Sequence, residues 1–121
     1  MSPGSSANTD SNSPYLRLCK EFGLDRHPAR FPIDVPSFFI KMLTDPNDLV
    51  VDIFGGSNTT GYAAETLNRR WLTFEASHEY LMASVFRFLE GHSNKGIQSV
   101  LDGLQDKESD LFIPAAEAAL F

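Results

Sequence analysis

The segment from Leu49 to Glu75 constrains the fold of this 121-residue chain more than any other part of it. It opens with an apolar run, LVVDIF at 49–54, which is typical of a strand buried on both faces of a parallel sheet. Two glycines end this run, a helical pattern follows at 59–68, and WLTFE at 71–75 is predicted to be a second strand. Two strands joined through a helix run parallel and form a βαβ unit. We therefore predict an α/β fold.

Helices are predicted on both sides of this unit. The first spans 13–23, with Ser13 as its N-cap and Pro14 as its first helical residue. Others are predicted at 36–43, at 79–89 after a Ser77 cap, and around 97–104, where apolar residues recur at helical spacing. The larger side chains expected to face inward are Tyr15, Leu18, Cys19, Phe22, Phe38, Phe39, Met42, Leu43, Tyr80, Leu81, Val85, Phe86, Phe88 and Leu89.

Composition divides the chain into three parts. Residues 1–12 are rich in Ser, Gly and Asn and are predicted to be a flexible leader, while 13–91 contain the predicted domain. Residues 92–121 form a tail with one amphipathic helix, and the Ala-rich stretch 111–121 has no clear pattern. Only two strands are evident, and a two-stranded sheet is not stable by itself. The sheet is therefore expected to be incomplete.

The charge balance and residue usage exclude several classes of protein. Sixteen acidic and ten basic residues leave a net charge of −6, which disfavours a chain that binds nucleic acid mainly through phosphate contacts. The one cysteine, Cys19, excludes an internal disulfide framework, and no spacing of residues predicts a metal site. No apolar run approaches the roughly 20 residues of a membrane helix, and the leader has no secretory signal pattern. We expect a soluble, cytoplasmic protein.

The turn after the first predicted strand is a candidate ligand site. Gly55 and Gly56 fall where a strand must turn into a helix, and a side chain there would block a ligand lying against the backbone. Glu75 ends the next strand, 19 residues after Gly56, where a carboxylate binds ribose hydroxyls in βαβ nucleotide sites. Asp52 would repel a pyrophosphate and attract a ligand that carries an ammonium group. This favours S-adenosylmethionine over NAD, although an ordinary tight turn or a small NAD-binding module stays open.

Three motifs in this chain resemble those of DNA methyltransferases that modify exocyclic amines, at cytosine N4 or adenine N6. DIFGGSNTTG at 52–61 is similar to the D-P-F-x-G-S-G-T-T signature of that family, and HPARFP at 27–32 is similar to the segment that precedes it. RRWLTFE at 69–75, followed by HEY at 78–80, resembles the family's next strand and helix. The resemblance extends from about Asn12 to Leu89 and is closest to the cytosine-N4 enzymes of bacterial restriction–modification systems. It implies a partial Rossmann-like fold, a βαβα unit preceded by helices, that depends on S-adenosylmethionine.

The resemblance also implies roles for individual residues. The cofactor-binding set is Phe31, Pro32, Asp52, Phe54, Gly55, Gly56, Ser57, Asn58, Thr59 and Glu75. Within it Asp52 would lie near the methionine end, Glu75 would hold the ribose, and Phe31 and Pro32 would line the pocket. The chain departs from the family pattern at Ile53, which replaces a proline, and at Asn58, which replaces a glycine. Asn tolerates the left-handed backbone conformation, so the turn is expected to survive.

The catalytic motif of the family, S-P-P-Y or D-P-P-Y, does not occur in these 121 residues. Ser13-Pro14-Tyr15 lacks the second proline and is better explained as a helix start. The basic groove that would hold DNA is also missing, so no residue of this chain is assigned a catalytic role. We expect a fragment, or one half of a split enzyme, that is inactive alone. Contact with DNA and the catalytic motif would then come from a region or a second chain outside this sequence.

Overall fold

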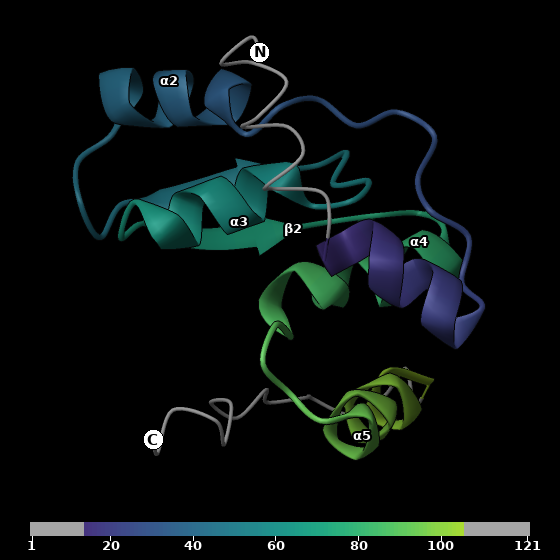
Figure 1. Ribbon diagram of the computed structural model, residues 1–121. Coiled ribbons are helices and arrows are strands. Elements are labelled where there is room, and N and C mark those ends of the chain that lie inside the picture. The colour runs from purple at the N-terminus through teal and green to yellow at the C-terminus, as the bar shows by residue number, and fades with distance from the viewer. Residues whose placement is uncertain (1–13, 106–121) are drawn as a thin grey trace, which may run out of the picture. The chain divides into compact units, whose positions relative to one another are not determined.

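The computed structural model describes residues 14–105 (Figure 1). The chain is helical over 14–22, and the elements that follow are α2 (Asp34–Leu43), β1 (Leu49–Asp52), α3 (Thr59–Thr66), β2 (Arg70–Thr73), α4 (His78–Ser84), the 3-10 helix η1 (Val85–Phe88) and α5 (Asn94–Gln105). The chain forms two compact units, with the boundary between Arg87 and Phe88. Both strands, α3 and α4 lie in the first unit, and the boundary falls near the end of η1.

The two strands pair in parallel, as the sequence pattern predicts. Leu49 lies opposite Arg70, and the register runs on to Asp52 opposite Thr73. The connecting helix α3 packs on one face of this pair (Figure 1), where Ala63 and Ala64 contact the half-buried Val50 and Trp71. Alanines on this side of α3 let the helix approach the sheet closely. The α/β class is therefore confirmed, with a sheet of two strands in the described residues.

The prediction that the first strand is buried on both faces is wrong. Side chains alternate between the two faces of a strand, and α3 covers only one of them. Leu49 and Val51 of β1 and Leu72 of β2 are exposed on the other face. Both strands also end earlier than predicted, so Ile53, Phe54, Phe74 and Glu75 lie beyond the last paired residues.

Helix α2 begins two residues before the predicted start, at Asp34, and its predicted inward face is wrong. Pro36 and Ile40 are its buried residues, and Ile40 joins Ala63 and Ala64 in a small core cluster. The larger apolar side chains, Phe38, Phe39, Met42 and Leu43, are exposed. Their spacing identified an amphipathic helix correctly, but among the described residues α2 packs against α3 through a narrow stripe centred on Ile40.

The helix at 14–22 contributes the buried residues expected of it, namely Tyr15, Leu18 and Cys19. Phe22 is half-buried, with its ring centroid 5.8 Å from that of the buried Phe86. The helix predicted at 79–89 is present as α4 followed by η1, and Ser77 caps it by accepting a hydrogen bond from the Tyr80 N–H. Phe86 and Leu89 are buried as predicted. The rest of the buried face differs from the prediction, because Met82, Ala83 and Ser84 are buried while Tyr80, Leu81, Val85 and Phe88 are only half-buried.

The second unit contains α5, an amphipathic helix as predicted. Ile97, Val100 and Leu101 are its buried residues. The leader at 1–12, Ser13 and the stretch 111–121 lie outside the described residues. Within 14–105, no helix has the length and apolar character needed to cross a bilayer.

Candidate functional site

The glycine turn that follows β1 is held by backbone and side-chain hydrogen bonds at each step. Phe54 donates its N–H to Oδ1 of Asp52 over 2.9 Å, and Gly55 donates to the carbonyl of Phe74 over 2.8 Å. Asn58 in turn donates its N–H to the carbonyl of Gly55 over 2.8 Å, which closes the turn. Residues 54–58 therefore form a loop that is tied to Asp52 at the end of β1 and to Phe74 directly after β2.

Glu75 lies directly beside this loop. Its Oε1 accepts the N–H of Gly56 over 3.0 Å, and its Oε2 accepts the N–H of Ser77 over 2.8 Å. The carboxyl ends of neighbouring parallel strands lie at the same edge of a sheet, which explains why residues 19 apart in sequence meet here. The structure thus brings Asp52, the glycines and Glu75 together.

The two glycines are required for different reasons. A Cβ on Gly55 would overlap Oγ1 of Thr73 on the neighbouring strand. Gly56 has a φ of +57°, in the left-handed region, and a Cβ there would lie 3.3 Å from Nε2 of His27. The turn is therefore restricted by close packing at its first glycine and by backbone conformation at its second.

Asn58 keeps the turn intact where the resembling family has a glycine. Its φ is +62°, and its Oδ1 accepts the N–H of Gly61 over 3.0 Å, so it also caps α3. Gly61 leaves room for this cap, because a Cβ there would overlap the Asn58 side chain. The expectation that Asn58 adopts the left-handed conformation is confirmed.

The segment 27–32 reaches the same loop through His27. The imidazole of His27 lies against Gly56 and packs edge-on against the ring of Tyr80, with centroids 4.8 Å apart. The backbone N–H of His27 donates to the hydroxyl of Tyr15 over 2.8 Å. Tyr15 is fully buried and lies in the first turn of the described helix at 14–22, which agrees with its interpretation as part of a helix start.

Arg87 is a site residue that the sequence pattern did not predict. It is only 4% exposed, and it donates Nε to the carbonyl of Ser57 over 2.6 Å and Nη2 to Oγ of Ser57 over 2.9 Å. Its guanidinium also lies 4.8 Å from the centroid of the Tyr15 ring, within cation–π range. The only sequence signal for a buried role was an arginine between two phenylalanines, Phe86 and Phe88.

Burial shifts the protonation equilibria of this cluster. Desolvation lowers the pKa of Arg87 to about 10 and raises the pKa of Tyr15 to about 12, because burial disfavours the charged form of each group. Burial likewise raises the pKa of the Cys19 thiol. At neutral pH Arg87 is therefore a buried cation and Tyr15 is neutral.

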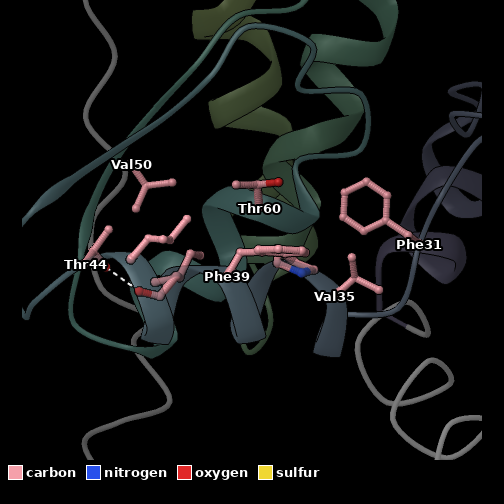
Figure 2. A pocket seen from close by; sticks show the side chains of 9 residues that line it. Phe31, Val35, Phe39, Thr44, Val50 and Thr60 are labelled. Atoms are coloured by element: carbon pink, nitrogen blue, oxygen red, sulfur yellow. Dashed lines mark hydrogen bonds between the residues drawn. The ribbon is translucent and has the colours of Figure 1, made fainter.

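Phe31 lines a separate apolar pocket of about 360 Å³ (Figure 2). The pocket is lined by residues of α2, β1 and α3; Figure 2 shows Phe31 and Val35 at one end of it, Val50 and Thr44 at the other, and Phe39 and Thr60 between them. Pro32 and the loop 54–59 do not contribute to its lining. The structure thus places Phe31 near the start of α3, in the wall of this pocket.

The predicted site residues differ in what they present to solvent. Phe54 is 84% exposed, whereas Ser57, Asn58 and Thr59 are buried, with Oγ of Ser57 3.3 Å from Oγ1 of Thr59. A ligand at this loop would meet the Phe54 ring and backbone groups, with the Asp52 and Glu75 carboxylates close to the glycines. Within 14–105 no three His, Cys, Asp or Glu side chains are close enough to hold a metal ion.

Comparison with known proteins gives a consistent match. The family model for DNA methylases of the N6/N4 type matches residues 4–86. The type II methyltransferase M.PvuII of Proteus hauseri is 52% identical over 104 residues, which cover 85% of this chain and 31% of that protein. M.BglI of Bacillus subtilis is 40% identical over 60 residues, 50% of this chain and 17% of that protein.

A solved structure agrees with the sequence matches. The PvuII DNA methyltransferase, described as cytosine-N4-specific, superimposes with a TM-score of 0.76 at 52% identity, over 84% of this chain and 36% of that chain. This chain therefore spans about a third of the length of these two relatives.

Proposed function

This chain belongs to the N6/N4 family of DNA methylases, and on that premise we propose that it is the S-adenosylmethionine-binding part of a site-specific DNA methyltransferase. The acceptor we propose is an exocyclic base amine, cytosine N4 in preference to adenine N6. The observation that carries the proposal is the bond between the Gly56 N–H and the Glu75 carboxylate, which joins the glycine loop to the end of the next strand.

The loop fits a sulfonium nucleoside better than a pyrophosphate. Two carboxylates, Asp52 and Glu75, lie at the carboxyl ends of the paired strands, and each accepts a backbone N–H of the loop. Negative charge at this edge of the sheet attracts the ammonium group of a methionine moiety and repels a phosphate. We propose that Asp52 faces the methionine end and that Glu75 binds the ribose, in a partial Rossmann-like fold.

The remaining proposed contacts come from the loop and from the segment before α2. Gly55 and Gly56 would contact the ligand through their backbone, and Phe54 would contact it through its exposed ring. The buried residues Ser57, Asn58 and Thr59 would hold this loop in place. We propose that Phe31, from the wall of the apolar pocket, and Pro32 also contact the ligand. The bound cofactor would supply an electrophilic methyl group, and the chain would position it.

The preference for cytosine N4 follows from the relatives. The structure that superimposes on this chain is of a cytosine-N4-specific DNA methyltransferase, and the sequence identity to it is 52%. Since DNA is the proposed substrate, we place the protein's action in the bacterial cytoplasm.

We propose that the catalytic motif is supplied by another segment or by a second chain. The 121 residues contain neither S-P-P-Y nor D-P-P-Y, and their net charge is −6. The described sheet has an uncovered apolar face that includes Leu49, Val51 and Leu72. Further protein packed on that face would complete the sheet and bring in the groups that orient the amine and hold the DNA.

Parallel calorimetric titrations with S-adenosylmethionine and NAD test the proposal. We expect saturable binding of S-adenosylmethionine and none of NAD. Glu65→Gln, a change on the exposed side of α3, is the control for altered charge, and it should leave the affinity unchanged. Binding of NAD without S-adenosylmethionine would instead indicate a nucleotide-binding module of another kind.

A further inference from the structure

We propose that Arg87 is a positioning residue for the glycine loop: by holding the carbonyl and the hydroxyl of Ser57 it fixes the loop conformation that binds the nucleoside. This inference rests on the function proposed above. It concerns a residue outside the βαβ unit and outside the motifs that predicted the site.

The contact between Arg87 and Ser57 is specific in its geometry. Two nitrogens of one guanidinium bind the carbonyl and the hydroxyl of a single residue, at 2.6 and 2.9 Å. Arg87 and Ser57 are 30 residues apart, and both are buried. Hydrogen bonds from a charged donor in a water-poor environment are stronger than those between neutral groups.

Arg87 completes a set of restraints on the loop. The Gly56 N–H is held by Glu75, and the Asn58 N–H by the carbonyl of Gly55. Ser57 lies between these two residues, both of which have positive φ. Without Arg87, the carbonyl and the hydroxyl of Ser57 would lose their charged donors. The loop backbone, which has positive φ on both sides of Ser57, would then lose one of its restraints.

Arg87 also connects the loop to the segment 27–32. Its guanidinium packs on the Tyr15 ring, and the Tyr15 hydroxyl accepts the backbone N–H of His27. The His27 ring then lies against Gly56. Arg87, in η1, therefore links the glycine loop to the helix at 14–22 and to the segment 27–32. We predict that loss of the Arg87 side chain affects the ligand site as well as stability.

The chain offers a matched control for this test. Arg69 binds Thr44 in the same manner, donating Nε to the hydroxyl over 2.9 Å and Nη2 to the carbonyl over 2.7 Å. Thr44 is the C-cap of α2 and is not part of the glycine loop. Arg87→Lys and Arg69→Lys each keep the charge and remove a two-pronged contact. Arg87 is the more deeply buried of the two and also packs on Tyr15, so the comparison rests on the Kd and on exchange in 54–61 and not on the thermal midpoint.

The experiment uses the full 121-residue chain and three measurements: the thermal midpoint, the Kd of S-adenosylmethionine, and amide hydrogen exchange over residues 54–61. We expect both lysine variants to lower the midpoint by a few degrees. Arg87→Lys alone should raise the Kd about tenfold or more and accelerate exchange in 54–61. Ser57→Ala, which removes only the hydroxyl acceptor, should have a smaller effect of the same kind and serves if Arg87→Lys does not fold.

Two outcomes would overturn the inference. In the first, the Kd and the exchange rates of Arg87→Lys lie within twofold of those of Arg69→Lys. Arg87 would then contribute only to general packing. In the second, hydrogen exchange over 54–61 is unchanged in Ser57→Ala, which would show that the contact between Arg87 and Ser57 does not restrain the loop. A wild-type chain that does not bind S-adenosylmethionine would contradict the proposed function instead, and the exchange comparison would still decide the role of Arg87.

Discussion

The backbone N–H of Gly56 lies 3.0 Å from Oε1 of Glu75, and this bond joins the turn after β1 to the residue that closes the segment after β2. The second oxygen of Glu75 accepts the N–H of Ser77, the N-cap of α4. One carboxylate therefore sets both the glycine loop and the start of the next helix. Its removal should affect ligand binding and stability together.

Glu75→Gln should weaken binding of S-adenosylmethionine by about tenfold. The amide keeps one oxygen acceptor, so one of the two N–H groups loses its partner, and the unfolding free energy should fall by about 1 kcal/mol. Calorimetric titration and urea unfolding give the two quantities. Glu65→Gln makes the same chemical change on an exposed position of α3 and should alter neither. Wild-type affinity in Glu75→Gln would show that the carboxylate has no part in the site.

Gly55→Ala should destabilise the chain through a steric conflict with one identified atom. The new Cβ would overlap Oγ1 of Thr73, and forcing extra atoms into a packed site costs about 1–3 kcal/mol. That oxygen is buried and has no hydrogen-bond partner among the described residues, so Thr73→Ala should itself be nearly neutral.

The double variant Gly55→Ala/Thr73→Ala should then recover more than half of the lost stability. A double-mutant cycle from urea unfolding measures this coupling directly. Additive effects of the two changes would mean that Gly55 is needed for its backbone conformation and not for the space beside Thr73.

The elements nearest the site could be predicted from the sequence because local signals determine them. An apolar run ended by two glycines, a helical pattern and a second apolar run are sufficient to specify a parallel pair joined by a helix. The meeting of Gly56 with Glu75 follows from that topology, since both lie at the same end of adjacent strands. Ser77 and Asn58 were assigned correctly as a cap and as a left-handed residue for similar local reasons.

Burial could not be predicted in the same way, because it depends on which other segments cover a surface. Phe39 and Val51 are apolar and suitably spaced, yet both are exposed in the described residues. Arg87 shows the opposite error, since charged residues are rarely buried and its role requires Ser57 and Tyr15 to meet it from distant positions. Contacts of this long range leave no periodic signal in a single sequence.

The phenol of Tyr15 should titrate near pH 12 in the folded chain. Burial raises its pKa from the ordinary value of 10.0 to about 12, so the folded state holds its proton more tightly than the unfolded state does. The stability that this group contributes is fully present below pH 10 and is lost as the pH rises toward 12. Ultraviolet difference titration of wild type against Tyr15→Phe isolates this residue from the other tyrosines, and a midpoint near 10 would contradict its burial.

The uncovered face of the sheet should be the surface through which this chain joins the catalytic part of the enzyme. The reagent for testing this is the portion of M.PvuII that this chain does not match, since the matched part is 31% of that protein.

We expect no transfer of labelled methyl groups to DNA from either piece alone, and transfer from the mixture. Val51→Asp and Leu72→Asp place a charge on this face and should abolish transfer by the mixture while leaving the Kd of S-adenosylmethionine within about twofold, because both side chains are already exposed on the face of the sheet that α3 does not cover. Gln98→Asp, an exposed change on α5, is the control and should support full transfer. Methylation by this chain alone would contradict the assignment of the catalytic motif to another segment, and full transfer with Val51→Asp would exclude this face as the joining surface.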